Sequence, residues 1–162
     1  MTTLTRRRGI VLAALVGLFV STYLYLYSIG FYGELACGAS GGCSVVQASQ
    51  YAYFMGFSVA GWGLGWYLAV LAVAVLAVSG RRGDARWVSI ALVALSTGGL
   101  LFTIYLKALE IFVIHAICRW CVVSAVLAAI IFLLCLPEWK RMRNGGAREG
   151  APEATSETAP AT

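Results

Sequence analysis

Length and composition exclude a soluble globular domain. The chain has 162 residues, of which 60% are hydrophobic and only 12% are charged. A soluble domain of this size cannot bury so much apolar surface, so lipid must act as part of the solvent. The net charge of +5 comes without a continuous basic face, which argues against nucleic-acid binding.

Four stretches of the chain are long enough to cross a bilayer, which takes about 20 predominantly apolar residues. They cover residues 9 to about 31, about 57 to 78, 87–106 and about 118 to 136. In lipid every backbone N–H and C=O group needs an internal hydrogen-bond partner, so each stretch is predicted to be a helix. The sequence therefore predicts an all-α fold, an integral membrane bundle of four transmembrane helices.

The positions of the cations predict the orientation of this bundle. An even number of crossings places both termini and the connection at 79–86 on one side of the membrane. Ten of the 12 lysine and arginine residues fall on that side, and only Lys107 and Arg119 fall on the other. Because cytoplasmic segments are enriched in these residues, both termini are predicted to be cytoplasmic. The protein is then a multi-pass protein of the inner membrane.

Three parts of the chain follow from these spans. Residues 1–8 are the cytoplasmic N-terminus, 9–136 the transmembrane domain with an extracytoplasmic cysteine loop at 32–56, and 137–162 a cytoplasmic tail. The tail is rich in Gly, Ala, Pro, Glu and Thr without periodicity, and is expected to be disordered from about residue 144. The first apolar run exceeds the roughly 7–15 residues of a signal peptide, so it is predicted to stay uncleaved.

Four of the five cysteines fall on the predicted extracytoplasmic side, where disulfides form and persist. Cys37 and Cys43 lie in the loop, separated by Gly-Ala-Ser-Gly-Gly. This spacer is small and flexible, so the two sulfurs can approach to bonding distance without strain. Cys118 and Cys121 form a Cys-x-x-Cys motif at the outer end of the fourth span. Cys135, near the cytoplasmic end, is interpreted as a small apolar side chain.

The Cys-x-x-Cys motif predicts redox chemistry. At a helix start it puts the sulfurs of Cys118 and Cys121 on one face, one turn apart. The helix dipole and the adjacent Arg119 favour thiolate over thiol, and a thiolate of lowered pKa is a good leaving group. Burial at the membrane edge opposes this effect. An inert structural disulfide is the weaker interpretation, because closing so short a loop stabilises little.

Two other interpretations concern metal and proton transfer. The two cysteine pairs could form a four-thiolate zinc site. Zinc-binding pairs usually lie in ordered knuckles of a soluble module, so no metal is predicted here. His115, three residues before the motif, is expected to be an interfacial side chain, with proton transfer as the alternative.

Two dithiol pairs on one side of a membrane suggest an electron relay. A pair on a loop can meet a soluble partner, and a pair on the bundle can meet an acceptor in the membrane. The sequence has no haem or metal motif, so the acceptor is expected to be lipid-soluble. A quinone is the natural candidate, and it would bind between helices near Cys121.

These residues and their neighbours resemble the vitamin K epoxide reductase family. The resemblance covers roughly residues 10–136 and rests on Cys37-x5-Cys43, Ser49, Gly65-Trp66-Tyr67, Tyr105-Leu106-Lys107 and Ile117-Cys118-Arg119-Trp120-Cys121-Val122. It implies a four-helix bundle that encloses a quinone of the menaquinone, ubiquinone or vitamin K type. Bacterial members couple quinone reduction to disulfide formation in secreted proteins. The unrelated DsbB group has its Cys-x-x-Cys first, so the cysteine order argues against that group.

The resemblance also implies a role for each catalytic cysteine. Cys37 corresponds to the cysteine that the partner thiolate attacks, and Cys43 to the shuttle that attacks Cys118. Cys121 corresponds to the sulfur that faces the quinone ring. The family function implied is that of a quinone-dependent protein-disulfide oxidoreductase.

Ser49 matches a family serine beside the quinone pocket, and so is expected to help bind the cofactor together with Cys121. Its other interpretation is a polar residue of the short amphipathic segment 44–54. Ser58 stands where many bacterial relatives have proline, which affects how the second span begins. No fused thioredoxin-like domain is present, so the expected partner is a separate thioredoxin-like, DsbA-type extracytoplasmic protein.

Two further functions use the same features. Reduction of vitamin K epoxide needs the same thiols and the same pocket. From a different class, the chain could be a non-enzymatic membrane scaffold whose cysteines are structural.

Overall fold

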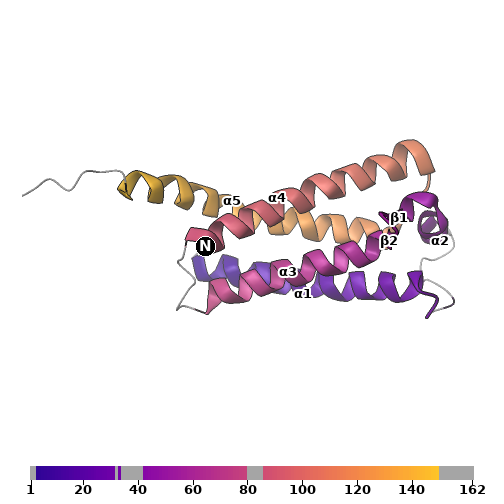
Figure 1. Ribbon diagram of the computed structural model, residues 1–162, viewed down its shortest axis with the longest axis horizontal. Helices are drawn as coiled ribbons and strands as arrows, with labels where there is room; N and C mark the ends of the chain where they lie inside the picture. Colours follow the sequence, from indigo (N-terminus) through magenta and orange to yellow (C-terminus); the bar gives the residue numbers. More distant parts are fainter. Residues whose placement is uncertain (1–2, 32, 34–41, 80–85, 150–162) are drawn as a thin grey trace, which may run out of the picture.

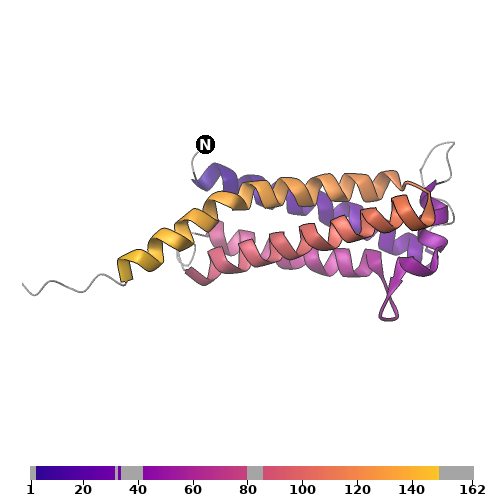
Figure 2. The same ribbon diagram turned by 90° about the horizontal axis from the view of Figure 1, so that it is seen from above.

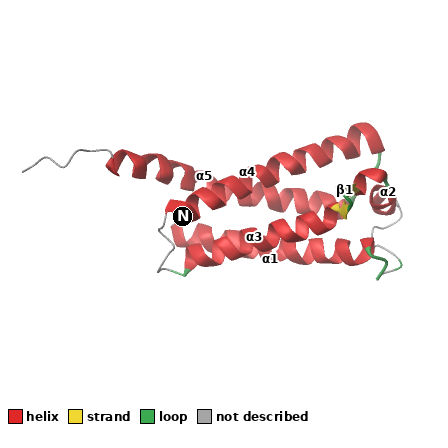
Figure 3. Ribbon diagram, viewed as in Figure 1, coloured by secondary structure: helices red, strands yellow, loops and turns green. Residues whose placement is uncertain are grey.

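The computed structural model describes residues 3–31, 33, 42–79 and 86–149 (Figures 1 and 3). Its helices are α1 (Thr3–Ser28), α2 (Gly42–Ala48), α3 (Val59–Val78), α4 (Arg86–Leu109) and α5 (Arg119–Glu149). Four short elements join them: a 3₁₀ turn η2 (Gln50–Ala52), the strands β1 (Tyr53–Phe54) and β2 (Phe57–Ser58), and a π-helical turn η3 (Glu110–Ile114).

The helices α1, α3, α4 and α5 lie side by side in an elongated bundle (Figures 1 and 2). Within the described residues, four helical stretches are long and apolar enough to cross a membrane: Leu4–Ser28, Val59–Val78, Arg86–Ile114 and Arg119–Pro137. This confirms the predicted all-α membrane bundle. Helix formation satisfies the backbone of each stretch internally, as a lipid environment requires.

The two ends of the bundle carry different elements. One end holds the start of α1, the end of α3, the start of α4 and the part of α5 that extends beyond the bundle (Figure 1). The opposite end holds α2, the β1–β2 hairpin and the turn between η3 and α5 (Figure 2). Cys43, Cys118 and Cys121 therefore meet at this second end, while Cys37 lies outside the described residues.

The N-terminal arginines belong to α1, which begins at Thr3 and so includes most of the segment predicted as a separate N-terminus. Arg7 is buried, and its Nη1 donates a hydrogen bond of 2.8 Å to the carbonyl oxygen of Ala77 in the last turn of α3. The last carbonyls of a helix lack partners within that helix, and they carry its negative dipole end. The guanidinium therefore fastens α1 to the end of α3.

Helix α5 continues beyond the predicted fourth span. It passes through Pro137 and ends at Glu149, so residues 144–149 are helical rather than disordered as expected. A proline within a helix bends it by removing one backbone hydrogen bond, and α5 changes direction where it leaves the bundle (Figure 2). Extending an existing helix costs little per residue. The remainder of the tail, 150–162, lies outside the described residues.

The core of the bundle depends on close contact between α1 and α3. Tyr67 of α3 is 1% exposed, and its ring lies against Gly17 of α1. A Cβ atom added to Gly17 would fall 2.0 Å from Tyr67 Cε1. The ring cannot move aside freely, because its hydroxyl bonds the carbonyl oxygen of Ser124 at 2.9 Å and also the Ser124 Oγ at 3.0 Å.

Replacing Gly17→Ala is expected to destabilise the bundle. The added methyl group overpacks the α1–α3 contact, which typically costs about 1–3 kcal/mol of unfolding free energy. Thermal or detergent-induced unfolding of the purified protein measures this loss. Gly65→Ala is the matched control, since a Cβ atom there meets nothing within 4 Å. Equal loss of stability in both variants would contradict the close contact between Gly17 and Tyr67.

Candidate redox site

The site is assembled where α2 lies against the turn that precedes α5. A Cβ atom added to Gly42 would fall 2.6 Å from the carbonyl oxygen of Ile117, so only glycine permits this approach. The next residue, Cys43, is 1% exposed and Cys118 is 0% exposed, and both belong to one buried cluster with Val46. The contact brings the loop cysteine into the same buried cluster as the first cysteine of the Cys-x-x-Cys motif.

The cysteines of the site are in different redox states. Cys43 is disulfide-bonded, whereas Cys118 and Cys121 carry free thiols. Cys37, the other predicted loop cysteine, lies outside the described residues. Cys135 is buried in the core of the bundle, away from this end, in agreement with its interpretation as an apolar side chain.

Cys118 occupies the start of α5. Its Sγ accepts a hydrogen bond from the backbone N–H of Cys121 at 3.4 Å, and its carbonyl oxygen accepts one from Val122 at 3.0 Å. The hydrogen bond from the Cys121 thiol, followed by those from the backbone N–H groups of Cys121 and Trp120, lowers the pKa of Cys118 to about 7, although burial raises it. Hydrogen bonds at a helix start stabilise a thiolate in this way.

Arg119 has a smaller role than its position suggests. Its side chain is exposed, and hydrogen bonds dominate the lowered pKa of Cys118. The predicted lowering of the Cys118 pKa is supported. Its cause is the neighbouring N–H and S–H groups, and not Arg119 as predicted.

The turn that carries Cys118 begins with an irregular end of the third membrane helix. The π-helical turn η3 covers Glu110–Ile114, and His115 follows with a φ of 55° in the left-handed region. Such a conformation is uncommon for a residue other than glycine, and π-helical turns frequently mark functional sites. The irregular turn sets the position of Cys118 and of Glu110, which is 4% exposed.

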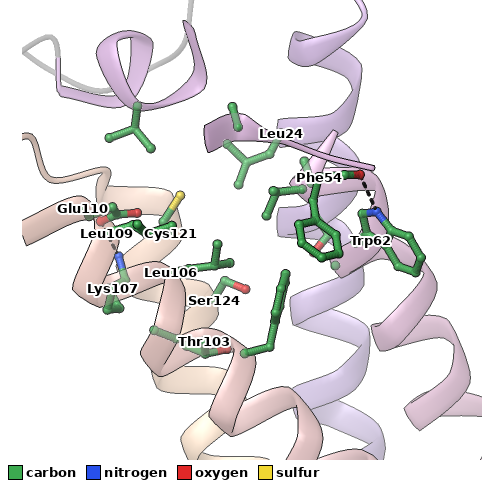
Figure 4. A pocket seen from close by; sticks show the side chains of 18 of the residues that line it. Leu24, Phe54, Trp62, Thr103, Leu106, Lys107, Leu109, Glu110, Cys121 and Ser124 are labelled. Atoms are coloured by element: carbon green, nitrogen blue, oxygen red, sulfur yellow. Dashed lines mark hydrogen bonds and ion pairs between the residues drawn. The ribbon is translucent and has the colours of Figure 1, made fainter. Parts of the chain in front are cut away.

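Beside Cys121 the bundle holds a cavity of about 410 Å³ (Figure 4). This volume lies within the roughly 300–1,000 Å³ typical of small-molecule sites. Cys121 lines the cavity and Cys118 does not. The two cysteines of the motif therefore differ in their surroundings: Cys118 is buried in one cluster with Cys43 and does not line the cavity, whereas Cys121 packs against that cluster and also opens to the cavity.

The side of the cavity away from Cys121 is aromatic. Phe54 packs edge-on against Trp62, with ring centroids 6.3 Å apart, and against Phe102 at 6.2 Å. The indole N–H of Trp62 donates to the carbonyl oxygen of Phe54 at 3.2 Å, as the dashed line in Figure 4 shows. This aromatic wall and the Cys121 sulfur enclose a space with room for a planar ring.

Ser49, the other predicted cofactor-binding residue, also lines the cavity. Its Oγ donates a hydrogen bond of 2.7 Å to the carbonyl oxygen of Val46. The hydroxyl hydrogen is therefore already engaged within the turn after α2, which leaves the oxygen as an acceptor in this arrangement. The serine lies in the predicted place, and its role in binding stays a prediction.

One charged pair in the cavity was not assigned any role from the sequence. Lys107 Nζ donates to Glu110 Oε2 at 2.6 Å, and both side chains line the cavity. The signal for this pair was opposite charge at a spacing of three residues in an otherwise apolar helix. His115, by contrast, is exposed and does not line the cavity.

The four-thiolate metal site considered from the sequence would lie at this end of the bundle. Over the described ranges, no group of three or more His, Cys, Asp or Glu side chains is arranged to hold a metal ion. The four-thiolate site considered above includes Cys37, which is not among these residues.

The pKa of Cys118 is testable by spectroscopy. Thiolate absorbance near 240 nm, taken as reduced wild type minus Cys118→Ser, is expected to rise with a midpoint near pH 7. Cys121→Ala removes the largest cause of the shift, so it is expected to move the midpoint upward. Cys135→Ala removes a distant thiol and is expected to leave it unchanged. A wild-type midpoint near the ordinary value of about 8.5 would contradict the hydrogen bonds that Cys118 accepts at the start of α5.

A comparison with known families identifies the chain. The model of the vitamin K epoxide reductase family matches residues 9–136, which is most of the chain and includes all four predicted catalytic cysteines. The chain therefore belongs to this family, as its motifs predicted. Membership makes it a membrane oxidoreductase of thiols and quinone.

Proposed function

We propose that this family member reoxidises a separate thioredoxin-like protein outside the cytoplasm and passes the electrons to a membrane quinone. The observation that carries the proposal is the division of surroundings within the Cys-x-x-Cys motif. Cys118 is buried in one cluster with Cys43 and does not line the cavity, whereas Cys121 lines it. A relay between a soluble thiol and a lipid-soluble acceptor needs this arrangement, with one sulfur for each neighbour.

The proposed orientation puts the site on the extracytoplasmic face. The end of the bundle opposite the site carries Arg6, Arg7, Arg8 and Arg86. Cations concentrate in the cytoplasmic segments of membrane proteins, so this end faces the cytoplasm. The cysteines then face an oxidising compartment, where a disulfide relay can operate.

The first half of the relay is a series of four thiol–disulfide exchanges. A thiolate of the partner attacks Cys37 of a Cys37–Cys43 disulfide, which releases Cys43 as a thiolate. Cys43 then attacks Cys118 of a Cys118–Cys121 disulfide and releases Cys121 as a thiolate. The partner's second thiolate resolves the partner–Cys37 disulfide, and the released Cys37 thiolate attacks Cys43 and releases Cys118. Each exchange forms one S–S bond and breaks one, and after all four the partner is oxidised and the motif holds two electrons. The burial of Cys43 with Cys118 supports the second step.

The second half of the relay takes place at the cavity. A bound quinone supplies the capacity to accept two electrons and two protons. Cys121 presents its sulfur to the ring, and the aromatic wall of Phe54, Trp62 and Phe102 would hold the ring from the other side. The residues present fit such a group, because flat aromatic surfaces and few polar side chains suit a lipid-soluble ring.

Cysteine variants test the scheme directly. Cys118→Ala and Cys121→Ala are each expected to abolish quinone-dependent oxidation of a dithiol partner, because the motif can no longer cycle. Cys37→Ala and Cys43→Ala are expected to block the protein partner yet spare oxidation of a small dithiol, which can reach the motif directly. Absorbance of the quinone measures the rate. Cys135→Ala is the control, and full activity in the Cys121 variant would overturn the scheme.

Trapping of a partner separates an enzyme from a scaffold. A thioredoxin-like partner that keeps only its attacking cysteine can open the Cys37–Cys43 disulfide but cannot resolve the mixed disulfide with Cys37, so that adduct is expected to accumulate. Non-reducing electrophoresis and mass spectrometry identify the adduct. A structural cysteine would give no such adduct, and that result would favour a membrane scaffold. Turnover of vitamin K epoxide by the same preparation would instead favour epoxide reduction.

A further inference from the structure

An ion pair lies inside the apolar cavity without a role in the scheme so far. Glu110 is 4% exposed, and its Oε2 accepts from Lys107 Nζ at 2.6 Å. Both residues belong to a helical stretch long and apolar enough to cross a membrane. Charged groups at such positions are costly to bury, are retained as pairs, and mark functional sites in membrane proteins.

The pair lies on the same side of the cavity as Cys121. Figure 4 shows the Glu110 carboxylate and the Lys107 amine beside the Cys121 sulfur, opposite Phe54 and Trp62. The charges of both residues act on Cys121, and that of Glu110 also reaches Cys118. Because Oε2 is bound to Lys107, the other carboxylate oxygen remains for a second partner.

The chemistry at Cys121 needs a group that takes a proton. Converting the Cys118 and Cys121 thiols into a disulfide forms one S–S bond and releases two electrons and two protons. Among the described residues that line the cavity, Glu110 is the only carboxylate and Lys107 the only cation. The other ionisable lining side chains besides Cys121 are Tyr51 and Tyr67, and a phenol hydroxyl is a poor proton acceptor compared with a carboxylate.

We propose that Glu110, held in place by its ion pair with Lys107, takes the proton from the Cys121 thiol. The S–H bond breaks, the carboxylate gains the proton, and the thiolate carries the electron pair. When the Cys118–Cys121 disulfide forms, both electrons and both protons leave with the reduced acceptor, so Glu110 returns to its carboxylate form. The inference rests on the proposed function for the identity of that acceptor.

Glu110→Gln separates this role from a structural one. Glutamine keeps the shape of the side chain and can still accept from Lys107, but it takes up no proton. It also leaves the ammonium uncompensated, which favours the Cys121 thiolate. The variant is therefore expected to react faster at Cys121 with an alkylating reagent, yet to turn over more slowly because no carboxylate passes the proton on to the acceptor. A general base typically contributes about 10²–10⁴-fold to a rate.

The experiment uses the full chain in lipid nanodiscs after mild reduction. N-ethylmaleimide is added at pH 7, and modification is followed by mass spectrometry. Trypsin cuts after Arg119 and so separates the Cys118 peptide from the Cys121 peptide. In Glu110→Gln we expect alkylation of Cys121 to rise by roughly threefold or more, and quinone-dependent oxidation of a dithiol to fall by at least about tenfold.

A double variant assigns the two effects to the two residues. Lys107→Met with Glu110→Gln removes both charges, which a buried site tolerates better than the loss of one. Alkylation of Cys121 is expected to return to within about twofold of the wild-type rate, whereas turnover stays at least about tenfold low. Ser96→Ala, a buried polar change on α4 outside the cavity, is the control and is expected to change neither rate.

The outcomes distinguish this inference from the proposed function. Faster alkylation together with slower turnover in Glu110→Gln supports the proton role. Unchanged or slower alkylation, or unchanged turnover, overturns it. A wild-type protein that oxidises dithiols with no dependence on quinone overturns the proposed function, and with it the role of Glu110 toward that acceptor. If the wild type is active with quinone but Glu110→Gln does not raise alkylation and lower turnover, the proton role of Glu110 fails and the proposed function stands.

Discussion

The contact between α2 and the turn before α5 is the one on which the redox site depends. It is possible because Gly42 has no side chain, so that its backbone approaches the carbonyl group of Ile117. The glycine thereby brings Cys43 into one buried cluster with Cys118. A thiol–disulfide exchange needs direct approach of two sulfurs. In the proposed relay, the local backbone fit of one glycine thus determines whether the loop and the bundle can exchange electrons.

The Cys-x-x-Cys motif gives its two sulfurs different chemistry through their positions at the helix start. Cys118 receives hydrogen bonds from the first turn of α5, which lower its pKa, and it is enclosed by α2. Cys121 lies one turn into the helix and opens to the cavity. The irregular turn η3 and the left-handed His115 are what bring the chain to this geometry. The asymmetry of the motif is therefore a property of the turn as much as of the cysteines.

Much of this protein could be predicted from its sequence, and the rest depends on packing between distant segments. Apolar length predicted the four spans because lipid admits only internally bonded backbone. Cysteine placement predicted that the loop and the motif share one end of the bundle, where Cys43 and Cys118 are buried in one cluster; their action as a relay stays a prediction. The close approach at Gly42, the inward position of Glu110 in η3 and the helical course of α5 beyond Pro137 could not be predicted. Each depends on tertiary contacts or backbone irregularity that leave no periodic pattern.

Arg7 connects the way this protein enters the membrane with the way it folds there. Cations before a first span hold that end of the chain on the cytoplasmic side during insertion. In the finished bundle the Arg7 guanidinium is buried against the last turn of α3. A lysine would preserve the sorting signal but would lose the planar fork of donors that arginine brings to backbone oxygens. Biogenesis and final architecture therefore place separate demands on one side chain, and arginine is the residue that meets both.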